Sequence, residues 1–222
     1  MSKVRFLPPS EIIIPPGVME ATFEEIYEEP MLVGASWNYA YNHGGPLTGH
    51  VMDVITQNVK KDMWRQGRKG LVPLIDTRSV LLMPGQYATL PRWHVPCSPS
   101  RGWQFYPDLQ AFQSGTVHYD CVLCSDPEGP EMEYLKRSAQ LDIDKGSNWK
   151  TIQQQLPTHT RTRKISHAVV AVANASTLRR PLEAEVRCWQ YIFRLYFYPG
   201  PAENTITTKS HVYDKFVTGQ GL

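Results

Sequence analysis

Short apolar segments, separated by Pro, Gly, Ser and Asp, follow one another from residue 71 to residue 198, and this spacing constrains the fold more than any other feature. The segments are LVPLIDTRSVLLM, QYATLPRWHV, TVHYDCVLC, MEYLKRSAQLDI, SHAVVAVANA and RCWQYIFRLYFYP. Between them, only NWKTIQQQLPTHTRTRK has the pattern of a helical turn and a basic loop. Strands at this spacing favour an antiparallel sandwich or barrel over a βαβ fold. We therefore predict a mainly β (α+β) protein built around a jelly-roll barrel.

One long helix precedes these strands, in the segment PLTGHVMDVITQNVKKDMWRQG. Apolar residues recur there at every fourth position and form one stripe: Val51, Ile55, Val59 and Met63. Pro46 suits the first turn of this helix, and Gly67 can end it. The stripe predicts a helix that packs on a sheet, within a helical N-terminal part at residues 21–70.

The two ends of the chain differ from the predicted barrel, which we place at residues 71–200 of a single domain. Residues 1–20 contain two Pro-Pro pairs, which exclude a regular helix and predict an extended arm. Residues 201–222 predict an extended tail. The arm is expected to wrap the surface of the protein or of a partner, and we expect a homo-oligomer. In the structural alternative given below, both ends connect neighbouring subunits.

Charge and hydropathy exclude several classes of protein. The net charge of +2 is too small by itself to predict long nucleic acid as a partner. No run of about 18 apolar residues could span a bilayer, and MSKVRFLPPSEIIIPPG lacks the pattern of a signal peptide. We therefore expect a cytoplasmic protein with no membrane partner. We interpret the basic segments RTRK and LRRP as solvated loop charges, with nucleotide or single-strand binding as the alternative.

The four cysteines are predicted to be reduced thiols, because the chain shows no sign of secretion: Cys97, Cys121, Cys124 and Cys188. Cys121 and Cys124 form a CxxC pair inside a predicted strand. Positions three apart on a strand point to opposite faces, so these two sulfurs are not expected to share a metal ion.

Two histidines and an aspartate are the first candidates for a functional site. His94 follows Trp93 at the end of a predicted strand, where it could ligate a metal or close a polar network. His118 and Asp120 are two residues apart on one strand, so they share a face and could line a cavity together. A half-exposed polar pair on the sheet surface is the alternative interpretation.

Arg194 lies in the middle of the last strand among bulky residues, where a buried guanidinium group needs a carboxylate or an anionic ligand as its partner. Four acidic residues could supply the carboxylate: Glu131, Glu133, Asp142 and Asp144. An anionic ligand is the alternative. We add Arg78, Trp93 and Trp103 as further candidates for the lining of such a ligand site.

The segment IDTRSVLLMPGQYATLPRWH, followed by HYDCVLCSDPEGPEMEYL and CWQYIFRLYF, resembles uncharacterised phage-type proteins with a cupin-like, double-stranded β-helix fold. The resemblance covers roughly residues 44–198. The wider fold includes oxygenases that use Fe(II) and 2-oxoglutarate. The resemblance therefore implies a metal-binding H-x-D motif, a distal histidine and a downstream arginine that binds the carboxylate of the oxoacid.

Carried over one residue at a time, the resemblance matches His94 to the first histidine and Arg194 to the downstream arginine. His94 is therefore the candidate metal ligand. Pro96 stands where the carboxylate belongs, and the segment RRPLEAE, where the distal histidine belongs, contains no histidine. We expect Fe(II) and 2-oxoglutarate as cofactors only if other residues replace these ligands.

Three functions remain open. The first is a non-catalytic phage-type protein of the host cytoplasm that binds a small anionic ligand or a nucleotide in the barrel cavity. The second is a structural jelly-roll protein of a virus-like assembly, located in the virion. The third is an enzyme, either an oxygenase with substituted metal ligands or a hydrolase that uses His94 and His118 as acid and base. The missing ligands favour the binding protein.

Overall fold

The computed structural model describes residues 2–15, 20–95, 116–143, 147, 149–207 and 213–214. Its largest sheet has six strands, antiparallel throughout, in the order β2-β11-β7-β13-β5-β4. These strands are β2 (Glu11–Ile13), β11 (Val170–Asn174), β7 (Val117–Cys124), β13 (Cys188–Tyr198), β5 (Val72–Leu82) and β4 (Ala35–Ser36). The two longest, β13 and β5, pair along their whole length, so they fix the centre of the sheet.

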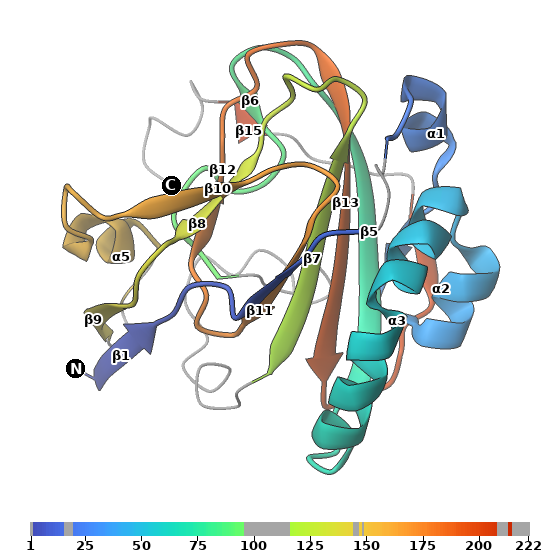
Figure 1. Cartoon of the computed structure of the whole chain (residues 1–222), viewed down its shortest axis with the longest axis horizontal. Helices are drawn as coiled ribbons and strands as arrows, with labels where there is room; N and C mark the ends of the chain where they lie inside the picture. Colours follow the sequence, from blue (N-terminus) through green and yellow to red (C-terminus); the bar gives the residue numbers. More distant parts are fainter. Residues whose placement is uncertain are drawn as a thin grey trace.

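A smaller sheet in the order β10-β8-β12 lies on one side of the six-stranded sheet (Figure 1). Its strands are β10 (Thr162–Ile165), β8 (Met132–Leu135) and β12 (Arg179–Pro181). The other strands of the described residues form three two-stranded sheets: β1 (Ser2–Phe6) with β9 (Ala139–Ile143), β3 (Met31–Val33) with β14 (Thr205–Thr207), and β6 (Gln86–Tyr87) with β15 (Tyr213–Asp214). The mainly β prediction is confirmed. Within the described ranges no sheet closes on itself, so the predicted closed barrel is not found.

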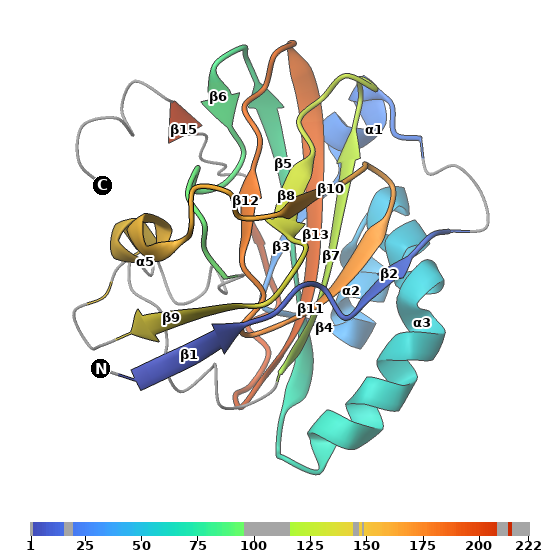
Figure 2. The same ribbon diagram turned by 60° about the vertical axis from the view of Figure 1, so that its left-hand side comes forward.

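Three helices cover the opposite face of the six-stranded sheet, and a fourth lies apart from them beside the smaller sheets (Figures 1 and 2). The first three are α1 (Phe23–Glu28), α2 (Trp37–His43) and α3 (Pro46–Gly67), and the fourth is α5 (Trp149–Gln155). Among the described helices, none is long and apolar enough to cross a membrane.

Helix α3 has the bounds that the sequence predicts, and Val51, Ile55 and Val59 are buried against the sheet. Met63 is 37% exposed, so its place in the apolar stripe was predicted wrongly. Residues four apart advance about 40° around a helix at each step, and after three steps the stripe has turned away from the sheet. Asp62 takes the buried position instead and accepts a hydrogen bond from the hydroxyl of Tyr119.

A buried carboxylate holds the start of α3. Glu29 is 4% exposed and accepts hydrogen bonds from the backbone N–H groups of Leu47 (3.1 Å) and Thr48 (2.7 Å). These N–H groups belong to the first turn, which has no partners within its own helix. The glycine at position 45, just before the helix, leaves room for this contact, because a Cβ there would collide with Oε2 of Glu29.

The N-terminal segment is extended, as predicted, but it pairs with strands of its own chain. β1 lies beside β9 (Figure 2), and β2 forms an edge of the six-stranded sheet. Phe6 is fully buried. In the tail, β14 pairs with β3. The described strands β1, β2 and β14 therefore complete sheets of the same chain.

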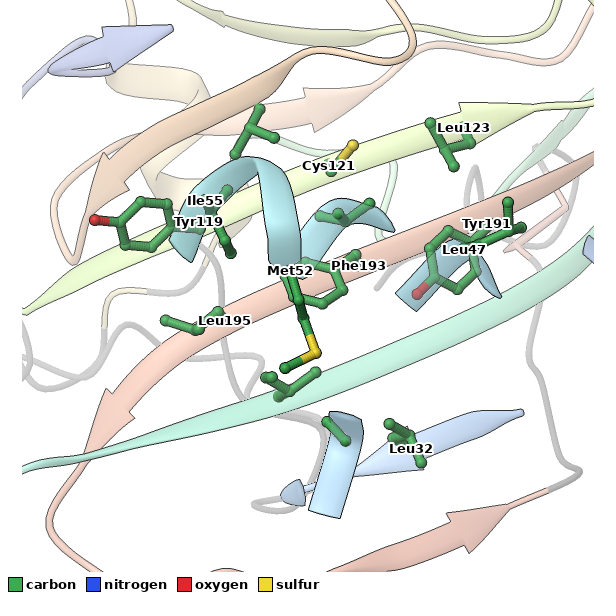
Figure 3. Close-up of a cluster of buried hydrophobic side chains, with 14 of the residues drawn as sticks. Leu32, Leu47, Met52, Ile55, Tyr119, Cys121, Leu123, Tyr191, Phe193 and Leu195 are labelled. Atoms are coloured by element: carbon green, nitrogen blue, oxygen red, sulfur yellow. The ribbon is translucent and has the colours of Figure 1, made fainter. Parts of the chain in front are cut away.

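Alternation along the strands divides the core into two parts. One face of the six-stranded sheet carries Cys121, Leu123, Tyr191, Phe193 and Leu195, which pack against Leu47, Met52 and Ile55 of α3 (Figure 3). The other face points toward the smaller sheet, and its apolar residues pack with Met132 and Tyr134 of β8. Burial of each large apolar side chain contributes about 1.5–3 kcal/mol, so both faces are fixed in register. The second face also holds the polar candidates.

Candidate functional site

The polar residues of the inner face lie in rows across the strands. Asp120 of β7 is directly opposite Arg194 of β13, and Arg194 is directly opposite Asp76 of β5. The next row joins His118 to Tyr196, and their rings stack with centroids 6.4 Å apart. Directly opposed side chains on one face are near neighbours, so the sheet register itself brings these groups together.

Asp120 is the partner of Arg194. Nε of Arg194 donates to Oδ1 of Asp120 at 3.0 Å, and both side chains are largely buried. The predicted partners Glu131, Glu133 and Asp142 do not fill this role, while Asp144 lies outside the described residues. The pairing of β7 with β13 instead places the carboxylate of Asp120 directly opposite Arg194.

A second arginine, which the sequence interpretation missed, reaches the same carboxylate from the smaller sheet. Nη1 of Arg179 lies 2.9 Å from Oδ1 of Asp120, and each of these side chains is 1% exposed. Burial raises the pKa of the Tyr134 hydroxyl, and the Arg179 cation opposes that shift. The interpretation of LRRP as solvated loop charges is wrong for Arg179, because its side chain is buried. Adjacent arginines on a strand point to opposite faces, so the pair Arg179-Arg180 itself signals that one of them faces inward.

His94 lies beside Arg179 because their backbones form an antiparallel bridge. The N–H of each residue donates to the carbonyl of the other, at 3.0 and 2.9 Å. The ring of His94 is buried, and its Nδ1 lies 2.7 Å from the carbonyl oxygen of Arg92. His94 is thus anchored to the strand that carries Arg179.

Both histidines are neutral at pH 7. Burial lowers the pKa of His94 to about 4, and the Arg179 cation lowers it further while Asp120 opposes the shift. Burial also lowers the pKa of His118 to about 4, against the attraction of Asp120 and with a smaller contribution from Arg179. The same two charges act on both rings, so the two histidines share one buried environment.

Several polar atoms of this inner face are buried with no hydrogen-bond partner among the described residues. They include Oδ2 of Asp120, Oδ2 of Asp76 and Nδ1 of His118. A buried polar atom of this kind costs about 1–3 kcal/mol when it stays unpaired. Such atoms mark places where a bound molecule or ion can complete the hydrogen bonding.

Asp76 and Arg78 continue the inner face on β5. Burial raises the pKa of Asp76 to about 7, although its Oδ1 accepts a hydrogen bond from the N–H of Gly34 at 2.7 Å. Arg78 is half-buried and lies opposite Ile192 in the next row. Two guanidinium groups, those of Arg179 and Arg194, therefore contact the one carboxylate of Asp120 in this group.

Of the two candidate tryptophans, the structure describes Trp93. Trp93 is buried in a hydrophobic cluster with Val95, Leu135 and Trp149, and the guanidinium group of Arg180 lies 4.9 Å from the centroid of its ring. Trp103 lies outside the residues that the structure describes, as does Pro96.

Cys121 and Cys124 point to opposite faces of the sheet, as the sequence predicts. Cys121 lies in the helix-side core and Cys124 on the inner face, so the CxxC thiols point apart. The sulfur of Cys124 instead accepts a hydrogen bond from Nε2 of Gln190 at 3.4 Å. Cys97 lies outside the described residues.

The residues around Asp120 fit a divalent metal poorly. Its Oδ1 is already held by two guanidinium cations, and a metal ion at this carboxylate would be repelled by both. Among the described residues, no group of three or more His, Cys, Asp or Glu side chains is arranged to hold a metal ion. A metal at His94 stays a prediction of the sequence.

The fold and this site together define a mainly β protein with a buried, charged group of side chains between two sheets. No protein-family profile matches the chain, and no curated protein sequence matches it. One solved structure with some similarity is described as a non-heme monooxygenase, ThoJ–nickel complex, at 12% identity and a TM-score of 0.35. The alignment covers 88% of this chain and 63% of that chain, so this chain spans less than two thirds of that protein. The comparisons give no support to a phage-type relationship.

Proposed function

We propose that this protein binds a small anion between the six-stranded sheet and the β10-β8-β12 sheet. The observation that carries the proposal is the convergence of Arg179 and Arg194 on one carboxylate, that of Asp120. We also infer that the two sheets follow the double-stranded β-helix, or jelly-roll, arrangement. The support for this inference is the position of β12. It forms an antiparallel bridge with His94, and its Arg179 reaches Asp120 of β7 on the other sheet.

Charge balance supports an anion as the ligand. Taking a charge out of water costs several kcal/mol, and nearby opposite charges and hydrogen bonds must offset that cost. The two ion pairs given for the described residues set two cations against the single carboxylate of Asp120. A bound anion would balance the second of these cations at close range, where the interaction is little screened by salt.

The donors of the group suit a compact oxyanion. A guanidinium group presents several N–H donors in a planar fork, which matches carboxylate and phosphate oxygens. The histidines are neutral, so neither adds a competing charge. Arginines supplied by two different sheets can hold one anion from two directions.

The test is the melting temperature of the purified chain with phosphate, acetate or chloride at equal ionic strength. A ligand that binds only the folded chain raises the melting temperature as its concentration rises. We expect phosphate or acetate to do so and chloride not to. The matched variants are Arg194→Gln and Arg163→Gln. Arg163 is exposed on β10 and lies opposite the same Tyr134 as Arg179, so it controls for the loss of one positive charge.

The proposal predicts that Arg194→Gln abolishes the anion-dependent rise and that Arg163→Gln keeps it. Equal shifts in both variants would mean that the anions act through surface charge. No anion-specific shift in the unmodified chain would overturn the proposal.

A second candidate is a metal-dependent oxygenase with substituted ligands. The observation in its favour is that His118 and Asp120 share a strand face and each has one buried atom without a partner in the described part of the chain. The two arginines on Asp120 weigh against it. Titration with Fe(II) in the absence of oxygen, followed by calorimetry, distinguishes the two: one tightly bound equivalent would favour the oxygenase, and its absence favours the anion site.

A further inference from the structure

We propose that the ligand of this group is an oxyanion that carries its own hydrogen-bond donor, such as a hydrogen phosphate or a hydroxycarboxylate, and donates it to Oδ2 of Asp120. The inference rests on the proposed anion site and specifies the class of anion. It separates ligands that the two arginines alone could not distinguish.

The two oxygens of Asp120 have different surroundings. Oδ1 forms ion pairs with both Arg179 and Arg194, at 2.9 and 3.0 Å. Oδ2 of the same side chain is buried and receives no hydrogen bond from any described residue. An ionised carboxylate can only accept hydrogen bonds, so whatever completes Oδ2 must bring a donor.

The strand fixes the direction of this free acceptor. Asp120 is held from β13 by Arg194 and from β12 by Arg179, so its carboxylate cannot turn without losing an ion pair. Consider an anion that carries no proton and contacts both arginines. It would place one of its oxygens near Oδ2 of Asp120, with no hydrogen atom between the two oxygens. Two facing acceptors repel each other, and the repulsion is strong in a buried site.

His118 can contact an anion with or without a hydrogen-bond donor, so it does not discriminate between the two kinds of anion. Its Nδ1 is buried without a partner in the described ranges, and it lies on the same strand face as Asp120. A neutral imidazole has one donor nitrogen and one acceptor nitrogen, and the tautomer can follow the ligand. Selectivity should therefore come from Oδ2 of Asp120.

The experiment compares two pairs of anions that differ mainly in a donor. Phosphate and sulfate are both tetrahedral, but at pH 7 phosphate carries at least one proton and sulfate carries none. Glycolate and acetate are both monocarboxylates, but only glycolate has a hydroxyl group. Dissociation constants are measured by calorimetry on the intact chain at pH 7 and fixed ionic strength.

We expect phosphate to bind at least about tenfold more tightly than sulfate, and glycolate more tightly than acetate, because an unpaired buried acceptor costs about 1–3 kcal/mol. In Asp120→Asn, the amide can present N–H to the ligand, and the preference for phosphate over sulfate should shrink or reverse. Should that variant fail to fold, the two anion pairs on the unmodified chain still decide the question.

The outcomes separate this inference from the proposed function. If sulfate binds as tightly as phosphate and acetate as tightly as glycolate, the anion site stands and the donor requirement fails. If none of the four anions binds, the proposed function fails and this inference fails with it. Phosphate binding that Arg163→Gln weakens as much as Arg194→Gln does would also overturn both.

Discussion

The carboxylate of Asp120 and the guanidinium group of Arg179 meet 2.9 Å apart, each with 1% of its side chain exposed, and they join the six-stranded sheet to the smaller one. An ion pair this deeply buried gains little net stability, because desolvation offsets the attraction. Removing one partner is different, since the other charge is left buried and uncompensated. The pair therefore makes the stability of the sheet packing depend on Asp120.

Asp120→Ala should lower the free energy of unfolding by about 3–5 kcal/mol, because it leaves two buried guanidinium groups without their carboxylate. The comparison is Arg180→Gln. Arg180 pairs with Glu133 at 2.6 Å and its side chain is 38% exposed, and the hydroxyl of Thr162 still donates to the buried Glu133 after its loss, so this variant should cost only about 1–3 kcal/mol. Urea unfolding measures both. Similar values for the two variants would contradict this account of the cluster.

Acid should destabilise the protein through its two buried histidines. Their folded-state pKa values of about 4 lie below the ordinary value of 6.5, so the folded state takes up protons less readily than the unfolded state. Stability is then full above pH 6.5 and falls as the pH drops from 6.5 toward 4. His118→Asn should remove about half of this loss, roughly 3 kcal/mol. Urea unfolding from pH 4 to 8 tests it, and an unchanged pH slope in the variant would count against the burial of His118.

Asp76 should have the opposite pH dependence. Its pKa is raised from 3.8 to about 7, so the folded state favours the protonated acid. That contribution is full below pH 3.8 and is lost as the pH rises through 7. Asp76→Asn stays neutral at every pH, so its stability relative to the unmodified chain should improve between pH 5 and pH 8, by a few kcal/mol at most. A relative stability that does not change over this range would contradict the raised pKa.

Glu29→Gln should destabilise the start of α3. The carboxylate accepts two backbone N–H groups there and lies at the positive end of the helix. The amide keeps one acceptor and loses the charge, so we expect a cost of about 1–2 kcal/mol in urea unfolding. Glu25→Gln is the control, because Glu25 caps only the short and exposed α1. Equal costs would show that burial of Glu29 adds nothing.

The sequence predicts best where a regular pattern repeats. The bounds of α3 follow from Pro46, the apolar stripe and Gly67, and the strands β5, β7 and β13 fall inside predicted segments. The closed barrel fails because closure depends on pairing between distant strands, which a single sequence does not reveal. The shared strand face of His118 and Asp120 required only alternation, and the structure confirms it.

The site was predicted in part for the same reason. Arg194 was identified from its unusual mid-strand position, but its partner was wrong because the register between β7 and β13 could not be known. Arg179 was missed because a basic pair near a proline is usually solvated, and only the pairing of β12 with β8 turns it inward.

The most direct test of the central claim is calorimetric titration of the unmodified chain with phosphate at pH 7, repeated with Arg194→Gln. The proposed site predicts saturable binding at one phosphate per chain, which disappears in Arg194→Gln and persists in Arg163→Gln. Absence of saturable binding, or several weak equivalents that all three proteins share, would contradict it.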